Sequence, residues 1–584
     1  MAKWRLLPAS EEDARRLARV LDISPLLAQL LLHRGLADPE AADRFLHPDL
    51  EHLHPPSLLP DLDRGVDRLV RALQTGERLL IYGDYDVDGI TSVSLLMRLL
   101  RPLAKGDIFY QVPKRLEDGY GLSRAAVERA AHHGVGLILT VDCGITALEE
   151  AAAARALGLD IIITDHHEPG AVLPDAVAVI DPKRPGSRYP FPDLAGVGVA
   201  FKLGQALVER GLLPREELLR HLDLVALGTV ADVVPLLGEN RILARFGLEQ
   251  LNRTAHPGLR ALLEVTRLDG RAITAGHVGF ILAPRLNASG RLGDASLAVR
   301  MLLTADPERG REIARVLDRE NQERQRIEAE VVEQALALIE RSVDLDKTRA
   351  IVLGAAGWHP GVIGIAAARL VEAFHRPAIL VSFDGEEGRG SGRSIPGFNL
   401  YQGLAACADL LERFGGHEAA AGLGIRRDRL EEFSRAFAAH AERAIPPEAL
   451  EPTLRIEGEI GLDRVDLALA REIARMAPFG PGNPTPVLAC RKVKLVCCRG
   501  VGENGRHLKV RVAQDKVERD GIGFNLGKLL ASLNGAAEVD LAFAVEENSF
   551  NGSTEVQLNL RSLHASLDGP EAQPSVAATA AAGI

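Results

Sequence analysis

The sequence has few cysteines, no long apolar run and no excess of positive charge, and each absence excludes a class of protein. The 584 residues include only five cysteines and no C-x-x-C pair, which argues against a disulfide framework and for a reduced, intracellular chain. No apolar run is long enough to cross a bilayer and the first ten residues lack a signal-peptide pattern, so we expect a cytoplasmic protein without a membrane partner. Because the net charge is −11, any nucleic-acid surface must be a local basic patch.

The segment from about 60 to 235 alternates between apolar strands and amphipathic helices. Strands are predicted at 78–83, 107–112, 137–141, 159–164 and 177–180, with helices at 62–75, 89–101, 123–133 and 145–157. Strands that are apolar throughout and separated by helices indicate a parallel sheet covered on both faces.

The first of these strands runs into three acids at every second position, Asp84, Asp86 and Asp88, followed by Gly89. Neighbouring carboxylates repel one another unless a cation lies between them, and oxygen ligands suit hard cations such as Mg²⁺ or Mn²⁺. The alternatives are a solvated acidic turn and a calcium loop of the D-x-D-x-D-G kind. The calcium loop requires a glutamate at the position of Leu95.

Three other segments carry polar side chains that we expect at strand ends of the same sheet. They are Asp142 after strand 137–141, Asp165, His166 and His167 after strand 159–164, and Asp232 within the apolar run 228–235. Taken separately, an aspartate after a strand is most often a helix cap, and a histidine pair is most often a surface feature. The carboxyl ends of parallel strands form one crevice, however, so the four segments together predict a shared metal site.

The second half of the chain predicts a long helix and another α/β domain. A helix is expected over 306–342, and its polar middle, Asp318 to Arg326, is typical of a bridge between domains. Strands at 350–354 and 377–382 and a helix at 361–373 follow. Two glycine-dense loops, 388–394 and 414–422, could supply the backbone N–H groups and guanidinium that a phosphate needs. Tight turns with solvated arginines are the alternative.

The segment from about 455 to 565 is rich in β-type alternation and holds the expected basic patch. Between 490 and 511 a single acid, Glu503, accompanies seven basic residues: Arg491, Lys492, Lys494, Arg499, Arg506, Lys509 and Arg511. A small barrel with a basic face suggests an oligonucleotide-binding (OB) fold. A solvated sheet remains the alternative, because aromatic residues are few here.

The assembled motifs resemble the DHH phosphoesterase family. Its four successive motifs are matched by Asp84 to Gly89, Val141 to Gly144, Asp165 to His167, and Ala231-Asp232. The segments Ser391 to Arg393 and Gly415 to His417 resemble the DHH-associated domain. With two further segments, 284–291 and 478–484, the pattern is similar to the bacterial single-strand-specific DNA exonucleases of that family. This chain departs from some relatives at one position, because they have a histidine where it has Tyr82.

The resemblance implies a site of two Mn²⁺ or Mg²⁺ ions and a set of DNA contacts. The implied metal ligands are Asp86, Asp88, Asp142, His166 and Asp232, with Asp84 close by. His167 would contact the scissile phosphate and Asp165 would orient the histidines. The implied 5′-phosphate contacts are Arg115, Ser391 and Arg393, with His417 nearby, and the matched segment 284–291 adds Arg285 and Arg291. From the basic patch of the predicted barrel we add Lys492, Lys494, Arg506 and Lys509 as DNA contacts.

The fold and activity implied are those of an α/β enzyme that digests single-stranded DNA. We expect an N-terminal helical segment (1–58), a parallel-sheet DHH domain with a helical extension (59–305), a connecting helix (306–342), a DHH-associated α/β domain (343–450), an OB-fold barrel (451–565) and a disordered tail (566–584). The expected activity is 5′→3′ exonucleolytic release of 5′-mononucleotides in DNA repair and recombination, with a helicase and a single-strand-binding protein as candidate partners. A phosphoesterase for short oligonucleotides or cyclic dinucleotides and a non-catalytic DNA-binding scaffold are the alternatives.

Overall fold

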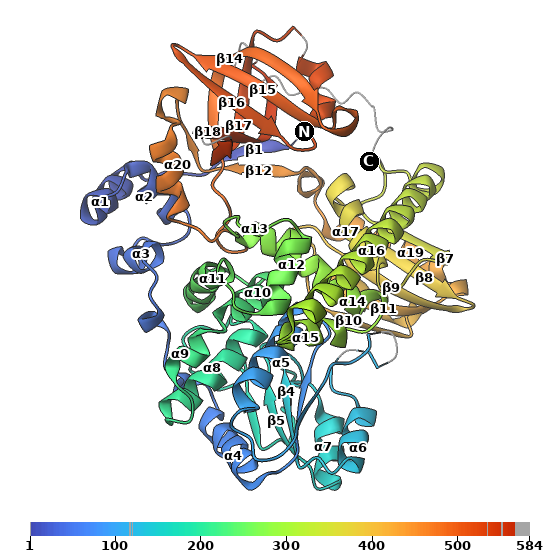
Figure 1. The fold of residues 1–584 in the computed structure, drawn as a ribbon. Coiled ribbons are helices and arrows are strands. Elements are labelled where there is room, and N and C mark those ends of the chain that lie inside the picture. The colour runs from blue at the N-terminus through green and yellow to red at the C-terminus, as the bar shows by residue number, and fades with distance from the viewer. Residues whose placement is uncertain (1, 116–117, 120, 534, 551–552, 567–584) are drawn as a thin grey trace. The chain divides into compact units, whose positions relative to one another are not determined.

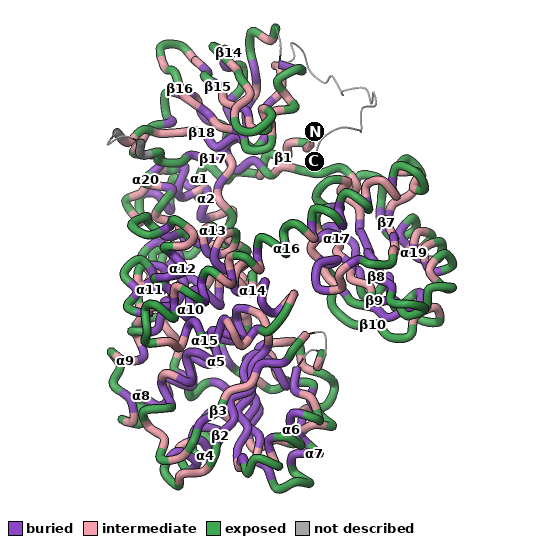
Figure 2. The backbone as a smooth tube through the Cα atoms, turned by 45° about the vertical axis from the view of Figure 1, so that its right-hand side comes forward, coloured by how far each residue is buried: buried purple, intermediate pink, exposed green. Residues whose placement is uncertain are grey.

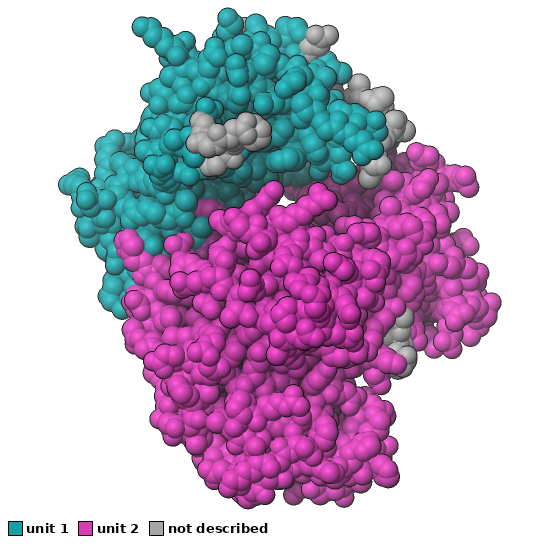
Figure 3. Space-filling view, in the orientation of Figure 1, with its two compact units in different colours: residues 1–46, 452–477, 485–584 teal, residues 47–451, 478–484 magenta. Residues whose placement is uncertain are grey.

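The computed structural model describes residues 2–115, 118–119, 121–533, 535–550 and 553–566, so the tail predicted over 566–584 lies, from residue 567, outside the described residues. The chain forms two compact units (Figure 3). Unit 1 consists of residues 1–46, 452–477 and 485–584, and unit 2 of residues 47–451 and 478–484. In the part of the chain that is described, no helix is both long and apolar enough to span a membrane.

Unit 2 contains the predicted parallel sheet. Its strands are β2 (Leu79–Gly83), β3 (Ile108–Gln111), β4 (Leu137–Val141), β5 (Asp160–Thr164) and β6 (Ala178–Ile180). They lie in the order β3-β2-β4-β5-β6, and every pair is parallel. The sequence-based bounds of these strands and of the four helices among them differ from the structure by at most three residues at an end.

Alternate residues of these strands enter two separate cores, one on each face of the sheet. Helices α4 (Leu62–Thr75), α5 (Val87–Leu100) and α8 (Gly196–Glu209) cover one face, where Ile81 and Leu139 are buried. Helices α6 (Arg124–His132) and α7 (Leu148–Ala156) cover the other, where Ile138 and Ile163 are buried. Burial on both faces explains why the strands are continuously apolar.

A helical layer extends the core on the α5 side (Figures 1 and 2). It contains α9 (Arg215–Leu219), α10 (Leu222–Ala231), α11 (Gly238–Leu251), α12 (Pro257–Val265), α13 (Ala275–His277), a π-helical turn (Val278–Leu282), α14 (Ala283–Leu292) and α15 (Ser296–Leu303). The segment 284–292, expected as a loop, is helix α14, because Pro284 lies in the first turn, where a helix has no use for its N–H. The long helix α16 (Pro307–Ser342) packs against α12 and α14 and then against α17.

The second sheet of unit 2 is mixed, in the order β10-β11-β9-β8-β7. Its elements are β7 (Ile351–Ala356), α17 (Ile363–Phe374), β8 (Ala378–Asp384), β9 (Glu387–Arg393), α18 (Leu400–Ala405), β10 (Arg413–Gly416), β11 (Ala420–Arg426) and α19 (Leu430–Ala444). The glycine-dense stretches expected as loops are largely strands. Their glycines make room for neighbouring side chains: a Cβ on Gly388 would lie 2.5 Å from the Phe383 ring, and one on Gly390 would lie 2.7 Å from Leu423.

Unit 1 is a closed β-barrel with helices from both ends of the chain. Strands β14 (Leu488–Val501), β15 (His507–Gln514), β16 (Val517–Gly523), β18 (Ser553–Ala565) and β17 (Glu538–Phe550) pair in that order, and β17 pairs again with β14 to close the barrel. The predicted OB-type barrel is thus confirmed. Helices α1 (Glu11–Leu21), α2 (Pro25–Leu32), α3 (Pro39–Leu46) and α20 (Leu467–Ala474) belong to the same unit.

The sequence suggested a helical N-terminal segment, but its first residues form a strand. Residues Lys3–Leu6 form strand β1, which pairs in parallel with β12 (Thr453–Ile456) ahead of the short strand β13 (Gly458–Glu459). Trp4 packs β1 against the barrel strands β14 and β18, since its ring lies 4.7 Å from the guanidinium carbon of Arg491 and 4.7 Å from the centre of the His564 ring.

Candidate metal centre and phosphate site

The acids after β2 occupy the tight connection between that strand and α5. Asp84 is buried, Asp86 caps α5 by accepting the N–H groups of Asp88 and Gly89, and Asp88 lies buried in the first helical turn. Gly89 is required here, because a Cβ would lie 2.4 Å from the carbonyl oxygen of Asp84. The strand, the cap and the glycine together direct the carboxylates to the carboxyl edge of the sheet.

The residues after β4 and β5 lie at the same edge. Asp142 is buried in the left-handed backbone region at φ 59°. Asp165 is also buried and accepts the N–H groups of Ile145 and His166, while its Oδ1 lies 2.7 Å from Nδ1 of His167. Asp165 therefore fixes the orientation of the histidine pair.

The fourth segment reaches the site from a helix and not from a strand end, which corrects the sequence-based expectation. Asp232 is the C-terminal cap of α10, whose residues are buried almost throughout. A Cβ on Gly228 would lie 2.3 Å from Thr91 Oγ1 and 2.9 Å from Asp88 Oδ1, so the glycine allows α10 to approach α5 closely. This contact brings Asp232 to Asp88.

The side chains converge into three overlapping groups of potential ligands, in each of which the ligand atoms lie within 4.8 Å of one another. The groups are Asp84, Asp86 and Asp142; Asp88, His166 and Asp232; and Asp142, His166 and His167. Nε2 of His166 lies 3.1 Å from Asp142 Oδ1 and 3.6 Å from Asp232 Oδ2. Because Asp142 and His166 each belong to two groups, the cluster is continuous and large enough for two adjacent cations.

Unsatisfied polar atoms show that the cluster fits metal ions. Asp84 Oδ1, Asp142 Oδ1 and Nε2 of His166, the ring nitrogen that faces the carboxylates, are buried without a hydrogen-bond partner among the described residues. Buried polar atoms are nearly always paired, and an unpaired set in one place calls for an ion. Carboxylate oxygens with an imidazole are the donors that Mn²⁺ and Mg²⁺ accept, so the residues fit these cations.

Burial shifts the pKa values of most groups in the cluster towards the neutral form, and His167 is the exception. Burial, and then the charge of Asp86, raises the pKa of Asp88 to about 7, and burial with neighbouring carboxylates raises the pKa of Asp84, Asp142 and Asp232 well above the usual value. Burial, and then His167, lowers the pKa of His166 to about 3, so this ring is neutral and able to act as a ligand. Burial opposes charge on His167 too, but its bond to Asp165 raises the pKa of His167.

Two groups that hold the cluster were missed by the sequence reasoning. The N–H groups of Gly196 and Val197, in the first turn of α8, donate to the two oxygens of Asp88 at 2.6 and 2.8 Å. Asn287 on α14 accepts the N–H of Val87 at 3.2 Å. For the contact of α8 with Asp88, the one signal in the sequence was the Ala-Gly-Val-Gly run over 195–198. Glycine is needed at 196, because a Cβ there would lie 2.6 Å from Asp142 Oδ1.

A second site of positive charge joins the two α/β parts of unit 2. Burial, and then Arg115, Arg324 and Arg393, lowers the pKa of Arg291 to about 10, and burial followed by Arg115 lowers that of Arg393. Arg393 Nη1 donates to Ser391 Oγ at 3.2 Å. A Cβ on Gly364, in the first turn of α17, would lie 2.7 Å from that oxygen. Guanidinium groups that disfavour one another's charge favour a bound anion.

Two other predicted DNA contacts, His417 and Arg285, have different surroundings from these arginines. His417 is exposed in the turn between β10 and β11, beside Arg393, because Arg393 pairs with Ala420 and Ser394 N–H donates to Ala419 O. Arg285 is half-buried, and its Nε donates to Asp318 of α16 at 2.8 Å. The guanidinium of Arg285 thus already has a carboxylate partner.

The basic residues of the barrel lie mainly on one outward face. Arg499 pairs with Lys509 and Cys497 with Arg511 across β14 and β15, while a bulge after Leu495 keeps Lys494 on the same side. Lys492 is exposed at φ 50°, and Arg506 is exposed with its Nε bonded to Asn525. The bulge therefore keeps the basic residues before and after it on the same outward side of β14.

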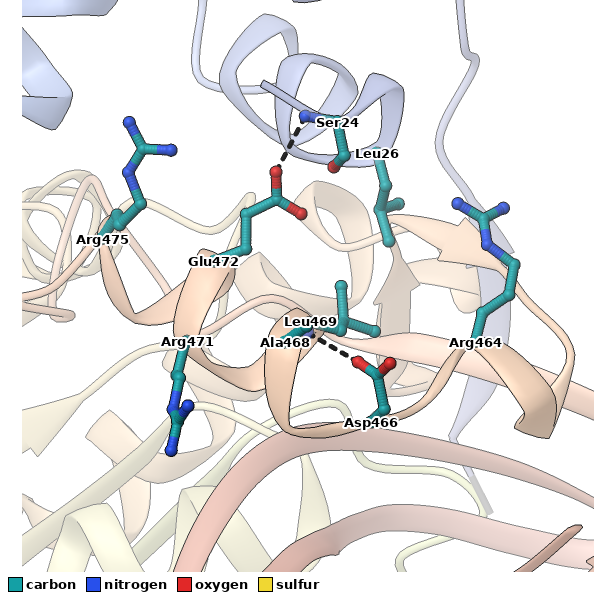
Figure 4. Close-up of a pocket in the computed structure, with 9 residues that line it drawn as sticks. All are labelled: Ser24, Leu26, Arg464, Asp466, Ala468, Leu469, Arg471, Glu472 and Arg475. Carbon is teal, nitrogen blue, oxygen red and sulfur yellow. Dashed lines mark hydrogen bonds between the residues drawn. The ribbon is translucent and has the colours of Figure 1, made fainter. Parts of the chain in front are cut away.

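A separate pocket of about 480 Å³ in unit 1 holds three arginines, but its acids already have partners (Figure 4). Glu472 accepts the N–H of Ser24 at 2.8 Å and Asp466 caps α20 through Leu469 N–H. No residue of the predicted site lines this pocket. The metal cluster is therefore the stronger candidate for chemistry.

Three family models match consecutive parts of the chain. The DHH family N-terminal domain matches residues 78–229, the DHHA1 domain residues 347–442 and the RecJ OB domain residues 456–562. The first two contain the metal cluster, apart from Asp232, and the phosphate-site residues Ser391 and Arg393. The third contains the basic barrel face.

Full-length relatives and a solved structure match the same architecture. The single-stranded-DNA-specific exonuclease RecJ of Bacillus subtilis is 39% identical over 96% of this chain and 70% of its own length. That of Salmonella typhimurium is 38% identical over 92% of this chain and 95% of its own. The crystal structure of RecJ in complex with Mn²⁺ from Thermus thermophilus, 32% identical, superposes with a TM-score of 0.82 over 98% of this chain and 80% of that one. The chain therefore belongs to the RecJ family of DHH proteins.

Proposed function

We propose that this protein is a single-stranded-DNA-specific 5′→3′ exonuclease that releases 5′-mononucleotides and requires two Mn²⁺ or Mg²⁺ ions. The overlap of the three ligand groups through Asp142 and His166 carries the proposal. Asp84, Asp86 and Asp142 would hold one ion, and Asp88, His166 and Asp232 the other. Two such ions supply an activated water and stabilise charge on the phosphate during an in-line displacement. The names of the B. subtilis and S. typhimurium relatives support the substrate.

The histidine pair has a separate task in this proposal. Asp165 holds Nδ1 of His167, and the raised pKa of His167 favours the protonated ring. A positive imidazole beside the cluster suits contact with a non-bridging oxygen of the scissile phosphate. His166, which stays neutral, serves as a ligand.

The arginine site between the two α/β parts would bind the 5′-terminal phosphate. Burial and then Arg115 lower the pKa of both Arg291 and Arg393, which an anion would offset, and Ser391 adds a hydroxyl. A terminal phosphate held at a fixed distance from the metals places the first phosphodiester at the cluster, which gives the 5′→3′ direction. His417 would border this site, and Arg285 would support it through α16.

The basic face of the barrel would bind the phosphate backbone of the single strand. Lys494 and Lys509 share their outward face with Arg499 and Arg511, and Lys492 and Arg506 flank it. Such a face binds the phosphate backbone without reading bases. We further propose action in the cytoplasm during DNA repair and recombination, with a helicase and a single-strand-binding protein as partners that deliver single strands.

Digestion of end-labelled DNA tests the function. A single strand labelled at its 5′ end should release labelled mononucleotide at once in Mn²⁺ or Mg²⁺, whereas a 3′-labelled strand should shorten progressively and a blunt duplex should persist. Chelator should stop both reactions. Faster turnover of a dinucleotide than of a long strand would instead support a small-substrate phosphoesterase, and no turnover of any substrate would support a binding scaffold.

Replacing Arg393 is expected to remove the preference for a 5′-phosphate. In Arg393→Gln the ratio of kcat/KM between 5′-phosphorylated and 5′-hydroxyl strands should fall by roughly 10- to 100-fold, because a charge-assisted hydrogen bond is lost. The matched control is Arg389→Gln, an exposed arginine of the same strand, which should keep the ratio of the parent protein. An unchanged ratio in Arg393→Gln would contradict the assignment.

A further inference from the structure

The segment 478–484 is a compact loop that the site described above leaves unexplained. It connects α20 to β14, both in unit 1, yet it packs as part of unit 2. Backbone hydrogen bonds between Gly480 and Asn483, at 2.9 and 3.1 Å, close it. The Asn483 side chain is buried and donates from Nδ2 to the carbonyl of Pro478 at 2.9 Å. The loop therefore has a defined shape of its own.

This loop rests on the turn that follows Asp232. The N–H of Leu236 donates to the carbonyl of Pro481 at 2.8 Å. A Cβ on Gly480 would lie 2.7 Å from the Leu236 side chain, and one on Gly482 would lie 3.0 Å from Leu237 and 3.2 Å from Pro235. Loop and turn thus touch without room for an additional methyl group.

The turn itself has a strained residue next to the metal cluster. Val233 has φ 64°, a region that β-branched residues rarely adopt, and its side chain is 66% exposed. Because the Val233 side chain is exposed, its own packing does not stabilise this backbone conformation. The conformation must therefore be stabilised by the residues around it. Asp232, directly before Val233, faces His166 at 3.6 Å.

A second tie leads from the same turn to the other side of the cluster. Asn240, which is fully buried, donates from Nδ2 to the carbonyls of Pro235 and Asp193, and its Oδ1 accepts the N–H of Ala195. The next residue, Gly196, donates to Asp88. The turn 233–237 is therefore held between Asn240 on one side and the loop 478–484 on the other.

We propose that the loop 478–484 is a positioning element for Asp232. By seating Pro235, Leu236 and Leu237 it would keep the strained turn in place and so set the affinity of the metal position formed by Asp88, His166 and Asp232. This inference rests on the proposed function, because it presumes that Asp232 is a metal ligand. The chain between two elements of the barrel unit would then contribute directly to the catalytic unit.

Two matched glycine variants of the full-length protein test the proposal. Gly482 has φ 72° and contacts the turn, whereas Gly270 has φ 74° and a Cβ there would meet nothing within 4 Å. Gly482→Ala and Gly270→Ala therefore share the same backbone strain and differ in the contact. Binding of Mn²⁺ should be measured by calorimetry and by electron paramagnetic resonance, and binding of a 5′-phosphorylated single strand in chelator.

In Gly482→Ala we expect about tenfold weaker binding of one of two Mn²⁺ ions, with nuclease activity restored at higher Mn²⁺ and unchanged strand binding. Gly270→Ala should bind both ions like the parent. Equal metal binding in the two variants would overturn the positioning role, whereas a parent protein that binds no Mn²⁺ would overturn the proposed function instead. If Gly482→Ala does not fold, Asn483→Asp, which removes the donor to Pro478 O, decides by the same measurements.

Discussion

Asp142→Asn is expected to abolish nuclease activity and, at the same time, to stabilise the metal-free protein. Asp142 is buried, belongs to two of the three ligand groups and has an oxygen with no hydrogen-bond partner in the described part of the chain. Loss of this carboxylate should lower kcat by about 10³-fold or more, as for other groups that act as a unit in catalysis. Binding of single-stranded DNA should largely persist, because the arginine site and the barrel face are unchanged.

The stabilisation has a definite pH dependence. Burial and neighbouring carboxylates raise the pKa of Asp142 in the folded state above its unfolded value of about 3.9, so the folded protein holds a proton that the unfolded chain releases. This carboxyl therefore lowers the free energy of unfolding increasingly as pH rises from about 4 towards the folded pKa. An asparagine has no such cost, so the gain in the free energy of unfolding caused by Asp142→Asn should grow as pH rises above about 4.

Thermal unfolding in chelator at several pH values, together with nuclease assays, measures both effects. The control is Asp181→Asn, because Asp181 is equally buried and its pKa is also raised, chiefly by burial, to about 7, but it belongs to none of the ligand groups. Asp181→Asn should raise Tm in the same direction and retain activity. An active Asp142→Asn protein would contradict the proposed metal centre.

Divalent cations are expected to raise Tm more at pH 8 than at pH 6. At pH 6 the raised pKa of Asp88, about 7, and those of its neighbours keep protons in the cluster, which a metal must displace. Each displaced proton makes binding about tenfold stronger per pH unit over this range. His166 adds no further dependence, because its pKa of about 3 leaves it neutral throughout.

Calorimetric titration with Mn²⁺ in buffers of different ionisation enthalpy counts the released protons. We expect at least about one proton per pair of ions at pH 6 and fewer at pH 8. Asp142→Asn is the informative comparison, since the loss of a ligand should remove most of the metal-dependent rise in Tm. Binding with no proton release at either pH would show that the carboxylates are already ionised in the metal-free protein.

The parallel sheet and three of the four segments that form the metal cluster could be predicted, because they depend on local sequence pattern. Strands buried on both faces are continuously apolar, and the side chains after Gly83, Val141 and Thr164 must meet at one edge of a parallel sheet. Asp232 was expected in the cluster because an aspartate within an apolar run needs a partner, but it was assigned to a strand end and not to a helix. Its run is apolar because α10 is buried on all sides, and such a helix cannot be told from a strand by periodicity.

Other features depend on contacts that no local pattern records. The glycines of β9 indicated loops, although they serve to admit Phe383 and Leu423 within a sheet. The N–H groups that fix Asp88 come from α8, more than a hundred residues away, and carry no side-chain signal. Arg285 shows the same limit, because only the structure reveals that Asp318 is its partner.

The pairing of β1 with β12 delays the folding of unit 1 during synthesis of the chain. About 450 residues separate these strands, which at 5–20 residues per second means that the N-terminus emerges from the ribosome roughly 20–90 s before its partner. During that time the apolar side chains of α2, such as Leu27, Leu30 and Leu31, lack the barrel unit to which they belong. The N-terminal strand therefore cannot pair until residues 453–456 have been made, so unit 1 completes its fold only after residues 47–451 of unit 2 have been synthesised.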